Sequence, residues 1–372
     1  MVKQNILDEA YEKAKTSLGK CATDNGLYAS CGVKGYEGVW SRDSNITLIG
    51  ASTDSQLIFR EQWKKSLETL KIHQSKLGQI PNAVLKFGAG KKPEVDYKSI
   101  DSSLWFVIGH YIYKERYKDA GLFKKHKNAI KKAILWLRYR DFGENLMLDQ
   151  LPTTDWQDAF PQKYGATIST QALYYKTLEL EADKKRLGKL KKVVNESKED
   201  GLWNGKFYWA YRWKNHNKYK EIGEWFDSFG NLIAILYGLS DKKMSEKILS
   251  YIRKHRINRP YPMKSIYPPI KKGSQYWEDY YYDAKATPNH YLNGGIWPYI
   301  GGIYILALIK MKKFKEAEKE LKILAEGNLK SPNNLFPEWI NPITKESHGN
   351  LQAWSAGTYM WAYNSLKKKR VL

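Results

Sequence analysis

Apolar and polar residues alternate along the chain with the period of an α-helix almost throughout. Six segments carry a Lys/Glu-rich polar stripe, which is typical of helices with one face in water. These segments span residues 3–19, 55–73, 121–139, 184–198, 242–255 and 313–326. Between them lie six segments that are apolar or small on nearly every side, which favours helices enclosed by protein. The enclosed segments span residues 43–52, 98–115, 168–182, 227–239, 292–310 and 350–366.

The strict alternation of the two kinds of helix predicts an all-α fold. We expect an (α/α)6 barrel, or six-hairpin toroid, in which an outer ring of helices wraps an inner ring and the first helix closes the circle beside the last inner one. The pattern uses residues 1–372 as a single domain. Long connections lead into the inner helices and short ones leave them, so we predict a functional cup at the N-terminal ends of the inner helices.

Composition and charge narrow the class of protein. Hydrophobic residues make up 42% of the 372 residues and aromatic residues 14%, which indicates a folded protein with a sizeable core. The formal net charge of +23 raises the question of a nucleic-acid partner. Most basic residues, however, are lysines spread along the outer-type helices, where they favour solubility, and no nucleic-acid-binding motif accompanies them. We therefore predict no nucleic-acid partner.

Three features bear on cofactors and location. Cys21 and Cys31 are too few for a disulfide framework and lie in no metal-ligand pattern, so no metal or cofactor is expected. Residues 1–20 form a charged amphipathic segment without the apolar core of a signal peptide. The apolar run 294–311 contains a proline and four glycines, which favours a buried helix over a membrane span. These features predict a cytoplasmic protein without a membrane partner, and a homo-oligomer stays open.

The starts of the six inner helices share an unusual composition. Each contains a tryptophan: Trp40, Trp105, Trp156, Trp225, Trp297 and Trp354. Four also contain aspartates: Asp43, Asp101, the pair Asp155 and Asp158, and Asp227. Because Asp and Asn are preferred N-cap residues, single members such as Asp43, Asp101, Asp227 and Asn350 have a simple reading as helix caps. Carboxylates and indoles that converge on one rim are also suited to a carbohydrate, whose hydroxyls need hydrogen bonds and whose C–H faces lie on aromatic rings.

Two carboxylates near these starts fit the needs of glycoside hydrolysis, in which one acid protonates the leaving oxygen and one carboxylate activates water or attacks carbon. Asp158 lies in "DWQDAFP", where Trp156 and Phe160 would desolvate the carboxyl group and raise its pKa, as an acid catalyst requires. Glu338 lies between a proline and a tryptophan in "NNLFPEWINP", an unusual position for a solvated residue. Four further carboxylates lead to the same rim and remain alternatives: Glu224, Glu278, Asp279 and Asp283.

From about Trp40 to Trp361 the chain resembles the (α/α)6-barrel glycoside hydrolases that include the alkaline/neutral invertases and the amylo-α-1,6-glucosidase domain of glycogen-debranching enzymes. "WSRDSNITLIG", "GQIPN" and "YKSIDSSLWF" are similar to debranching-type motifs. "TTDWQDAF" followed by "STQALYYKTL" is similar to the segment that carries the general acid in both groups, which implies this role for Asp158. "YLNGGIWP" and "FPEWINPITKESHG" resemble the invertase C-terminal segment, which implies that Glu338 is the general base of an inverting reaction.

The departures from the invertase pattern bear on the substrate. Invertases follow the acid with a pair of arginines, whereas Ala159 and Phe160 stand here, which weakens the case for sucrose. "DWQDA" is nearer the debranching pattern, yet the chain lacks the large transferase and glucan-binding regions of those enzymes. The resemblance therefore implies cleavage of an α-glucosidic bond in a short oligosaccharide, with sucrose hydrolysis as the alternative. Two other readings are a uronyl hydrolase or lyase on acidic sugars, which would need Arg or Lys in the cup, and a sugar-binding protein without catalysis.

The remaining site residues are predicted from their positions at the rim. Arg42 and Asp43 would hold sugar hydroxyls, with Asp101 beside them. Tryptophans would supply stacking faces, and amide, imidazole and carboxylate groups would supply hydrogen bonds. The predicted substrate-binding set is Trp40, Arg42, Asp43, Asp101, Trp156, Asp227, Asn293, Trp297, Trp339, His348, Gln352 and Trp354. His290 and Asn293 are equally well interpreted as supports, and the aromatic segment 207–219 as either a hairpin over the cup or a surface loop.

Overall fold

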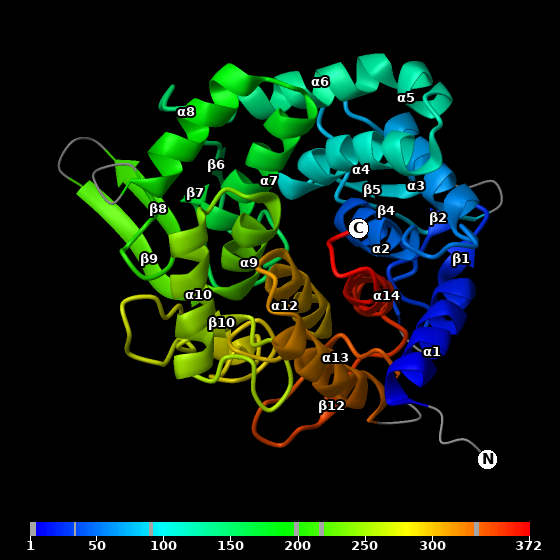
Figure 1. Cartoon of the computed structure of the whole chain (residues 1–372). Helices are drawn as coiled ribbons and strands as arrows, with labels where there is room; N and C mark the ends of the chain where they lie inside the picture. The colour runs from blue at the N-terminus through cyan, green and yellow to red at the C-terminus, as the bar shows by residue number, and fades with distance from the viewer. Residues whose placement is uncertain (1–4, 33–34, 89–91, 197–200, 216–218, 331–334) are drawn as a thin grey trace.

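Six helices form a closed inner ring in the computed structural model, which describes residues 5–32, 35–88, 92–196, 201–215, 219–330 and 335–372. In order around the ring they are α2 (Ser41–Ala51), α4 (Asp101–Tyr117), α7 (Ile168–Leu180), α9 (Ser228–Tyr237), α12 (Pro298–Lys310) and α14 (Ala353–Lys367). Each packs against the next, and α14 packs against α2 (Figure 1). The ring is therefore closed by contact between the first and the last inner helix.

The outer ring follows the same order. Its members are α1 (Ile6–Cys21), α3 (Arg60–Ile72), the short α5 (Gly121–Lys125) with α6 (Lys127–Arg138), α8 (Lys184–Asn195), α10 (Lys242–Lys254) and α13 (Phe314–Leu329). The first helix, α1, packs against both α13 and α14, as Figure 1 shows where the blue and orange helices meet. The predicted (α/α)6 barrel is thus confirmed, with helix ends that differ from the predicted ones by a few residues.

Burial explains why the two kinds of helix separate. Every residue of α2 is buried, and so is every residue of α12 except Lys310. The outer helix α10 buries only one stripe, made of Met244, Ser245, Ile248, Leu249 and Ile252. The apolar run of 294–311 is therefore a barrel helix, and among the described residues no helix is both long and apolar enough to cross a bilayer.

Glycines allow two inner helices to approach closely. A Cβ added to Gly50 of α2 would lie 2.0 Å from the backbone oxygen of Gly357 on α14. A Cβ on Gly357 would lie 2.6 Å from the Cα of Thr47. Since real side chains do not tolerate such distances, the α2–α14 contact that closes the ring depends on the absence of side chains at both positions.

All the described strands lie in the long connections that lead into inner helices. They are β1 (Ala22–Thr23), β2 (Gly26–Leu27), β3 (Gly38–Trp40), β4 (Ala83–Leu85), β5 (Glu94–Asp96), β6 (Asp149–Gln150), β7 (Gly165–Thr167), β8 (Trp209–Asn215), β9 (Tyr219–Asp227), β10 (Ile266–Tyr267), β11 (Trp339–Ile340) and β12 (Ser347–His348), and a short helix, α11 (Tyr280–Asp283), lies between β10 and α12. The sheets are antiparallel, with orders β1-β2, β3-β4-β5, β6-β7-β8-β9-β10 and β11-β12. The helix pattern did not predict these strands, because most of them are only two or three residues long.

The aromatic segment 207–219 contributes to the β8–β9 hairpin, of which residues 216–218 lie outside the described part of the chain. Figure 1 shows this hairpin at the periphery, beside α8 and α10. It pairs with β7 and β10 in the five-stranded sheet. A hairpin is therefore present, but it does not cover the centre of the ring.

Candidate active site

A small pocket lies at the N-terminal ends of the inner helices, where the sequence predicted a cup. The starts of three inner helices, α2, α12 and α14, contribute to it, together with the connection between β6 and β7 that leads to α7, the segment before β3 and the residue before β11. Its lining residues are Ala29, Tyr36, Trp40, Arg42, Asp43, Trp156, Asp158, Tyr291, Trp297, Glu338, Gln352 and Trp354. Its volume is about 100 Å³. Since a water molecule needs roughly 10–15 Å³ of such space, the pocket suits about one sugar ring rather than a longer chain.

Asp158 is presented to the pocket by the connection between β6 and β7. The connection is anchored by Lys163, whose Nζ lies 2.8 Å from Asp155 Oδ2 and 2.9 Å from Asp227 Oδ2, and all three of these side chains are at most 1% exposed. The Asp158 side chain itself is 42% exposed and faces the cavity. Desolvation by the surrounding protein raises the pKa of Asp158, while the Arg42 charge opposes this rise. The segment therefore holds a carboxyl group that keeps its proton more readily than a solvated aspartate does.

Glu338 is positioned by the β11–β12 hairpin. Its backbone N–H donates to the carbonyl of His348 at 2.9 Å, and a Cβ on Gly349 would lie 2.8 Å from the Glu338 Cβ. Gly349 also has a φ of 72°, so only glycine fits this turn without strain. The Glu338 carboxylate accepts hydrogen bonds from Tyr36 Oη at 3.1 Å and Tyr291 Oη at 3.3 Å. Desolvation raises the pKa of Glu338 to about 7, even though these two hydrogen bonds act in the opposite direction.

Arg42 connects the carboxylates at the base of the pocket. It is 3% exposed, and its Nη1 lies 3.1 Å from both carboxylate oxygens of Asp101. Its Nε lies 3.8 Å from Asp43, and its Nη2 lies 3.9 Å from Asp158. Burial raises the pKa of Asp43 to about 6, with Arg42 opposing the rise. One guanidinium thus faces three carboxylates, and its attraction for them limits the rise in their pKa values.

An aromatic bed underlies the pocket. Trp354 stacks on Tyr299, with ring centroids 4.1 Å apart and planes inclined by 10°. Trp297 meets Trp354 edge to face at 5.8 Å and Trp156 at 5.6 Å. Trp297 donates its indole N–H to the carbonyl of Tyr291 at 3.1 Å, whereas the indole nitrogens of Trp40, Trp156 and Trp354 have no hydrogen-bond partner among the described residues. The bed offers rigid apolar faces of the kind on which sugar rings lie.

Five of the predicted substrate-binding residues lie outside the pocket lining. Asp101 lies behind Arg42 and fixes its guanidinium. Asp227 pairs with Lys163, and Asn293 binds the backbone of Ile270 and Ala286. Trp339 and His348 stack on each other, with ring centroids 4.1 Å apart. In these five residues, the polar groups or ring faces that were predicted to contact sugar are engaged by other parts of the protein. Their placement therefore favours a role in supporting the pocket over direct contact with substrate.

Asp43, Asp101, Asp227 and Asn350 had two interpretations from the sequence, as helix caps or as ligand-binding residues, and the structure treats them differently. Asp227 is a true N-cap, since its carboxylate accepts the backbone N–H of Gly230 at 3.1 Å. Asp43 lies in the first turn of α2, whose N-cap is Trp40, and Asp101 is the first residue of α4. The N-cap of α14 is Gln352, not Asn350. Capping therefore explains one of the four residues.

The other carboxylate alternatives to Glu338 do not line this pocket. Glu224 and Glu278 line a separate groove beside the β8–β9 hairpin, with Tyr164 and Tyr276. Asp279 is the N-cap residue of the short helix α11, and Asp283 is its last residue. Within the described residues, no group of three or more His, Cys, Asp or Glu side chains is arranged to hold a metal ion.

Sequence reasoning missed the two tyrosines that bind Glu338. Tyr36 lies four residues before Trp40, and Tyr291 lies inside the quoted "YLNGGIWP" start. The only signal was their nearness in sequence to motif residues, because the direction of a phenol hydroxyl depends on the tertiary fold. The missed pair matters, since the two hydroxyls are the hydrogen-bond donors to the Glu338 carboxylate in the described structure.

Comparison with known sequences adds a family resemblance. The family model described as alkaline and neutral invertase matches residues 219–368. Neutral/alkaline invertase 1, mitochondrial, of Oryza sativa subsp. japonica is 30% identical over 145 residues, which are 36% of this chain and 22% of the rice protein. Alkaline/neutral invertase C, mitochondrial, of Arabidopsis thaliana is 32% identical over 144 residues, which are 37% of this chain and 21% of that protein. The match thus spans about a fifth of the length of these relatives.

Comparison with solved structures extends the likeness to the whole barrel. The GH63 mannosylglycerate hydrolase from Thermus thermophilus has a TM-score of 0.70 and 12% identity, and the likeness covers 95% of this chain and 99% of that one. A rhamnosidase from Klebsiella oxytoca has a TM-score of 0.68 and 15% identity, with 97% and 64% covered. The debranching-enzyme part of the predicted resemblance stays a prediction. The chain thus resembles the alkaline/neutral invertases over residues 219–368, which include Glu338 but not Asp158, and has the (α/α)6-barrel fold of known glycosidases over nearly its whole length.

Proposed function

We propose that this protein is an inverting glycoside hydrolase that cleaves an α-glucosidic bond of a short oligosaccharide. The observation that carries the proposal is the meeting of two carboxyl groups, 180 positions apart in sequence, in one small pocket with an aromatic bed. Desolvation raises the pKa of both groups, and each is among the causes that raise the pKa of Tyr36. A pair of this kind supplies the acid and the base that glycoside hydrolysis needs.

In the proposed mechanism, the two carboxyl groups of the pocket have different roles. Asp158, in its protonated form, donates a proton to the glycosidic oxygen as the bond to the anomeric carbon breaks. Glu338, in its ionised form, takes a proton from a water molecule that attacks the opposite face of that carbon, so the anomeric configuration inverts. Its pKa of about 7 suits a base at neutral pH, because proton transfer is most effective when the pKa lies near the working pH.

Charge within the pocket supports a neutral sugar. Asp43, Asp158 and Glu338 line it, and Arg42 is the only basic residue among the described lining residues. The Arg42 guanidinium already binds Asp101 and pairs with Asp43. A uronic acid would add a further negative charge to a lining whose one cation is already engaged, so the alternative of acidic sugars has little support.

Sucrose remains the second candidate substrate, favoured by the similarity of residues 219–368 to alkaline and neutral invertases. Against it, Ala159 and Phe160 stand where the invertase pattern has two arginines. Release of glucose from sucrose, maltose, isomaltose, trehalose and a branched limit dextrin separates these candidates. Proton NMR of the first product distinguishes inversion from retention. Binding of a sugar without product after long incubation would support the non-catalytic alternative instead.

A further inference from the structure

A second and larger cavity lies at the opposite end of the barrel, where the inner helices end. All six inner helices contribute to its wall, and its volume is about 530 Å³. The lining residues are Ile49, Ile112, Glu115, Arg116, Lys118, Lys176, Leu180, Leu236, Tyr237, Lys310, Trp361, Arg370, Val371 and Leu372. None of these residues lines the Asp158–Glu338 pocket.

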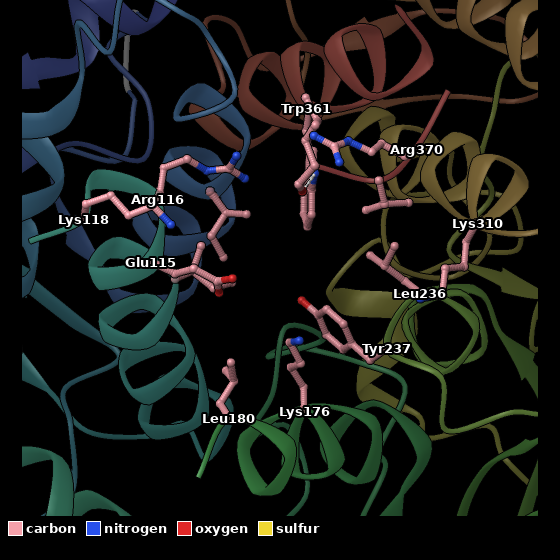
Figure 2. A pocket seen from close by; sticks show the side chains of 14 residues that line it. Glu115, Arg116, Lys118, Lys176, Leu180, Leu236, Tyr237, Lys310, Trp361 and Arg370 are labelled. Atoms are coloured by element: carbon pink, nitrogen blue, oxygen red, sulfur yellow. Dashed lines mark hydrogen bonds between the residues drawn. The ribbon is translucent and has the colours of Figure 1, made fainter. Parts of the chain in front are cut away.

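The wall of this cavity is strongly basic. Five of its lining residues are Lys or Arg, whereas Glu115 is its one acidic side chain among the described residues. Figure 2 shows Arg116, Lys176 and Arg370 reaching toward the centre from different sides. Cations near helix C-termini stabilise the helix dipole, which accounts for residues such as Lys310 at the end of α12. The dipole does not require basic side chains from separate helices to face one another across a cavity.

Two buried polar atoms in the wall have no hydrogen-bond partner among the described residues. The Nε of Arg116 is buried and makes no hydrogen bond among the described residues, and the same holds for the hydroxyl of Tyr237. The Tyr237 side chain is only 9% exposed, and Figure 2 shows its hydroxyl pointing into the cavity. Burial lowers the pKa of Arg116, Tyr117 and Glu115 oppose this fall, and the positive charge of Arg370 adds to it. Arg116 is partly buried and Arg370 is exposed, and two neighbouring guanidinium groups repel each other unless an anion lies between them.

The residues of the wall favour a ligand that carries other polar groups besides an anionic one. The cavity is several times larger than the pocket at the other rim, and Trp361 and Tyr237 give it aromatic surface. Glu115 also faces its centre (Figure 2). A carboxylate repels phosphate but accepts hydrogen bonds from hydroxyl groups. Guanidinium and ammonium groups around the wall, with a carboxylate and aromatic rings between them, suit a molecule that carries both a phosphate and several hydroxyls.

We propose that this basic cavity is a binding site for a sugar phosphate. Arg116 and Arg370 would bind the phosphate, and Tyr237 would donate its hydroxyl hydrogen to a phosphate or ring oxygen. Lys176 lies 5.8 Å from the centroid of the Tyr237 ring and pairs with Glu179 at 2.5 Å, so it contributes positive charge without being free to move far. The site lies beyond the proposed glycosidase pocket and does not depend on that activity.

Isothermal titration of the full chain with glucose 6-phosphate tests the proposal, with glucose and inorganic phosphate as comparison probes. We expect glucose 6-phosphate to bind at least tenfold more tightly than either. The double variant Arg116→Gln with Arg370→Gln should weaken its binding by at least a hundredfold, and Tyr237→Phe by about tenfold. The matched control is Lys192→Gln, which removes an exposed cation on the outer helix α8 and should leave the dissociation constant unchanged.

The outcomes separate the possible explanations. Equal dissociation constants for glucose 6-phosphate in the double variant and in Lys192→Gln would overturn the proposal, because binding would then lie elsewhere. Equal binding of inorganic phosphate and glucose 6-phosphate would overturn the sugar part of it. Circular dichroism checks that the double variant is folded, and Tyr237→Phe, which removes a single oxygen, gives an independent readout. None of these measurements requires turnover, so their failure is distinct from failure of the proposed hydrolysis.

Discussion

The two ends of the barrel are built from the same six inner helices but carry opposite chemistry. At the N-terminal ends, a pocket of about 100 Å³ is lined by three carboxylates, one arginine and a bed of indoles. At the C-terminal ends, a cavity of about 530 Å³ is lined by five basic side chains and one acidic side chain. The helix dipole accounts for part of this difference, because it favours negative charge at the first turns and positive charge at the last turns. The common direction of the inner helices thus favours acidic residues at one end of the barrel and basic residues at the other.

The two ends also differ in how their charges are satisfied. In the acidic pocket, the buried Arg42 lies within 4 Å of Asp43, Asp101 and Asp158. In the basic cavity, no carboxylate of the described residues forms a salt bridge with Arg116 within 4 Å, and the Nε of Arg116, like that of Arg42, makes no hydrogen bond there. A balanced cluster keeps its geometry before substrate arrives, as catalysis requires. A cluster with excess positive charge attracts an anionic ligand. The variants below test this difference between the two ends of the barrel, and those expected to have strong effects come first.

Removal of either proposed catalytic carboxyl group should have the largest effect. We expect Asp158→Asn and Glu338→Gln each to lower kcat/KM by about 10²–10⁴, because general acid–base catalysis contributes on this order. Steady-state kinetics on the best substrate measures the loss. Asp24→Asn, which changes a fully exposed aspartate in the β1–β2 turn, is the matched control and should retain full activity. Full activity in Asp158→Asn would remove that residue from the role of acid.

Arg42→Gln should destabilise the fold by about 3–5 kcal/mol, because it leaves buried carboxylates without their cation. Urea denaturation measures the change in the free energy of unfolding. The control is Arg60→Gln. Arg60 pairs with Asp119 at 2.8 Å but its side chain is 48% exposed, so we expect a loss of less than about 1 kcal/mol. Equal losses in the two variants would contradict the view that Arg42 balances the pocket.

Helices and site contacts differ in how far the sequence alone predicts them. Eleven of the twelve predicted helices are found within a few residues, and the twelfth, 121–139, is divided at His126 into α5 and α6. The prediction works because burial on all sides or on one side is a local, periodic property. The largest shift at an inner-helix start is that of α12, predicted from 292 and found from Pro298, since proline fits the first helical position and residues before it form turns. The pairing of Tyr36 with Glu338, or of Trp339 with His348, depends on the tertiary fold and leaves no periodic signal.

Glu338→Gln should stabilise the protein at pH 8 by about 3 kcal/mol, the free energy that corresponds to the pKa shift of Glu338. The folded-state pKa of Glu338 is raised to about 7, above its ordinary value of 4.5, so burying the charged form costs stability. The cost grows as pH rises from 4.5 to 7 and is complete above 7, so the gain of the variant should be small at pH 5. Urea denaturation at both pH values measures it. Glu346→Gln, at an exposed position before β12, should change stability by less than about 0.5 kcal/mol at either pH.

Tyr36→Phe should move one limb of the pH profile. Because the Tyr36 hydroxyl donates to the charged Glu338 carboxylate, its loss removes a factor that lowers the pKa of Glu338. A hydrogen bond worth about 1 kcal/mol corresponds to roughly 0.7 pH units. The wild-type profile of kcat/KM is expected to bend near pH 7, and the variant profile should bend at a higher pH. A downward shift would mean that Tyr36 does not stabilise the ionised form of Glu338.

Arg116→Gln should have the smallest effect and the opposite sign to Arg42→Gln. Arg116 is partly buried beside Arg370, and the pKa of Arg116 is lowered by burial first and also by that neighbouring charge. Glutamine removes both costs, so we expect stability to stay unchanged or to rise by up to about 1 kcal/mol in buffer without phosphate. Urea denaturation in parallel with Arg42→Gln measures the contrast. A loss as large as that of Arg42→Gln would mean that Arg116 is balanced within the fold, and the two ends of the barrel would then differ in the sign of their charge but not in its compensation.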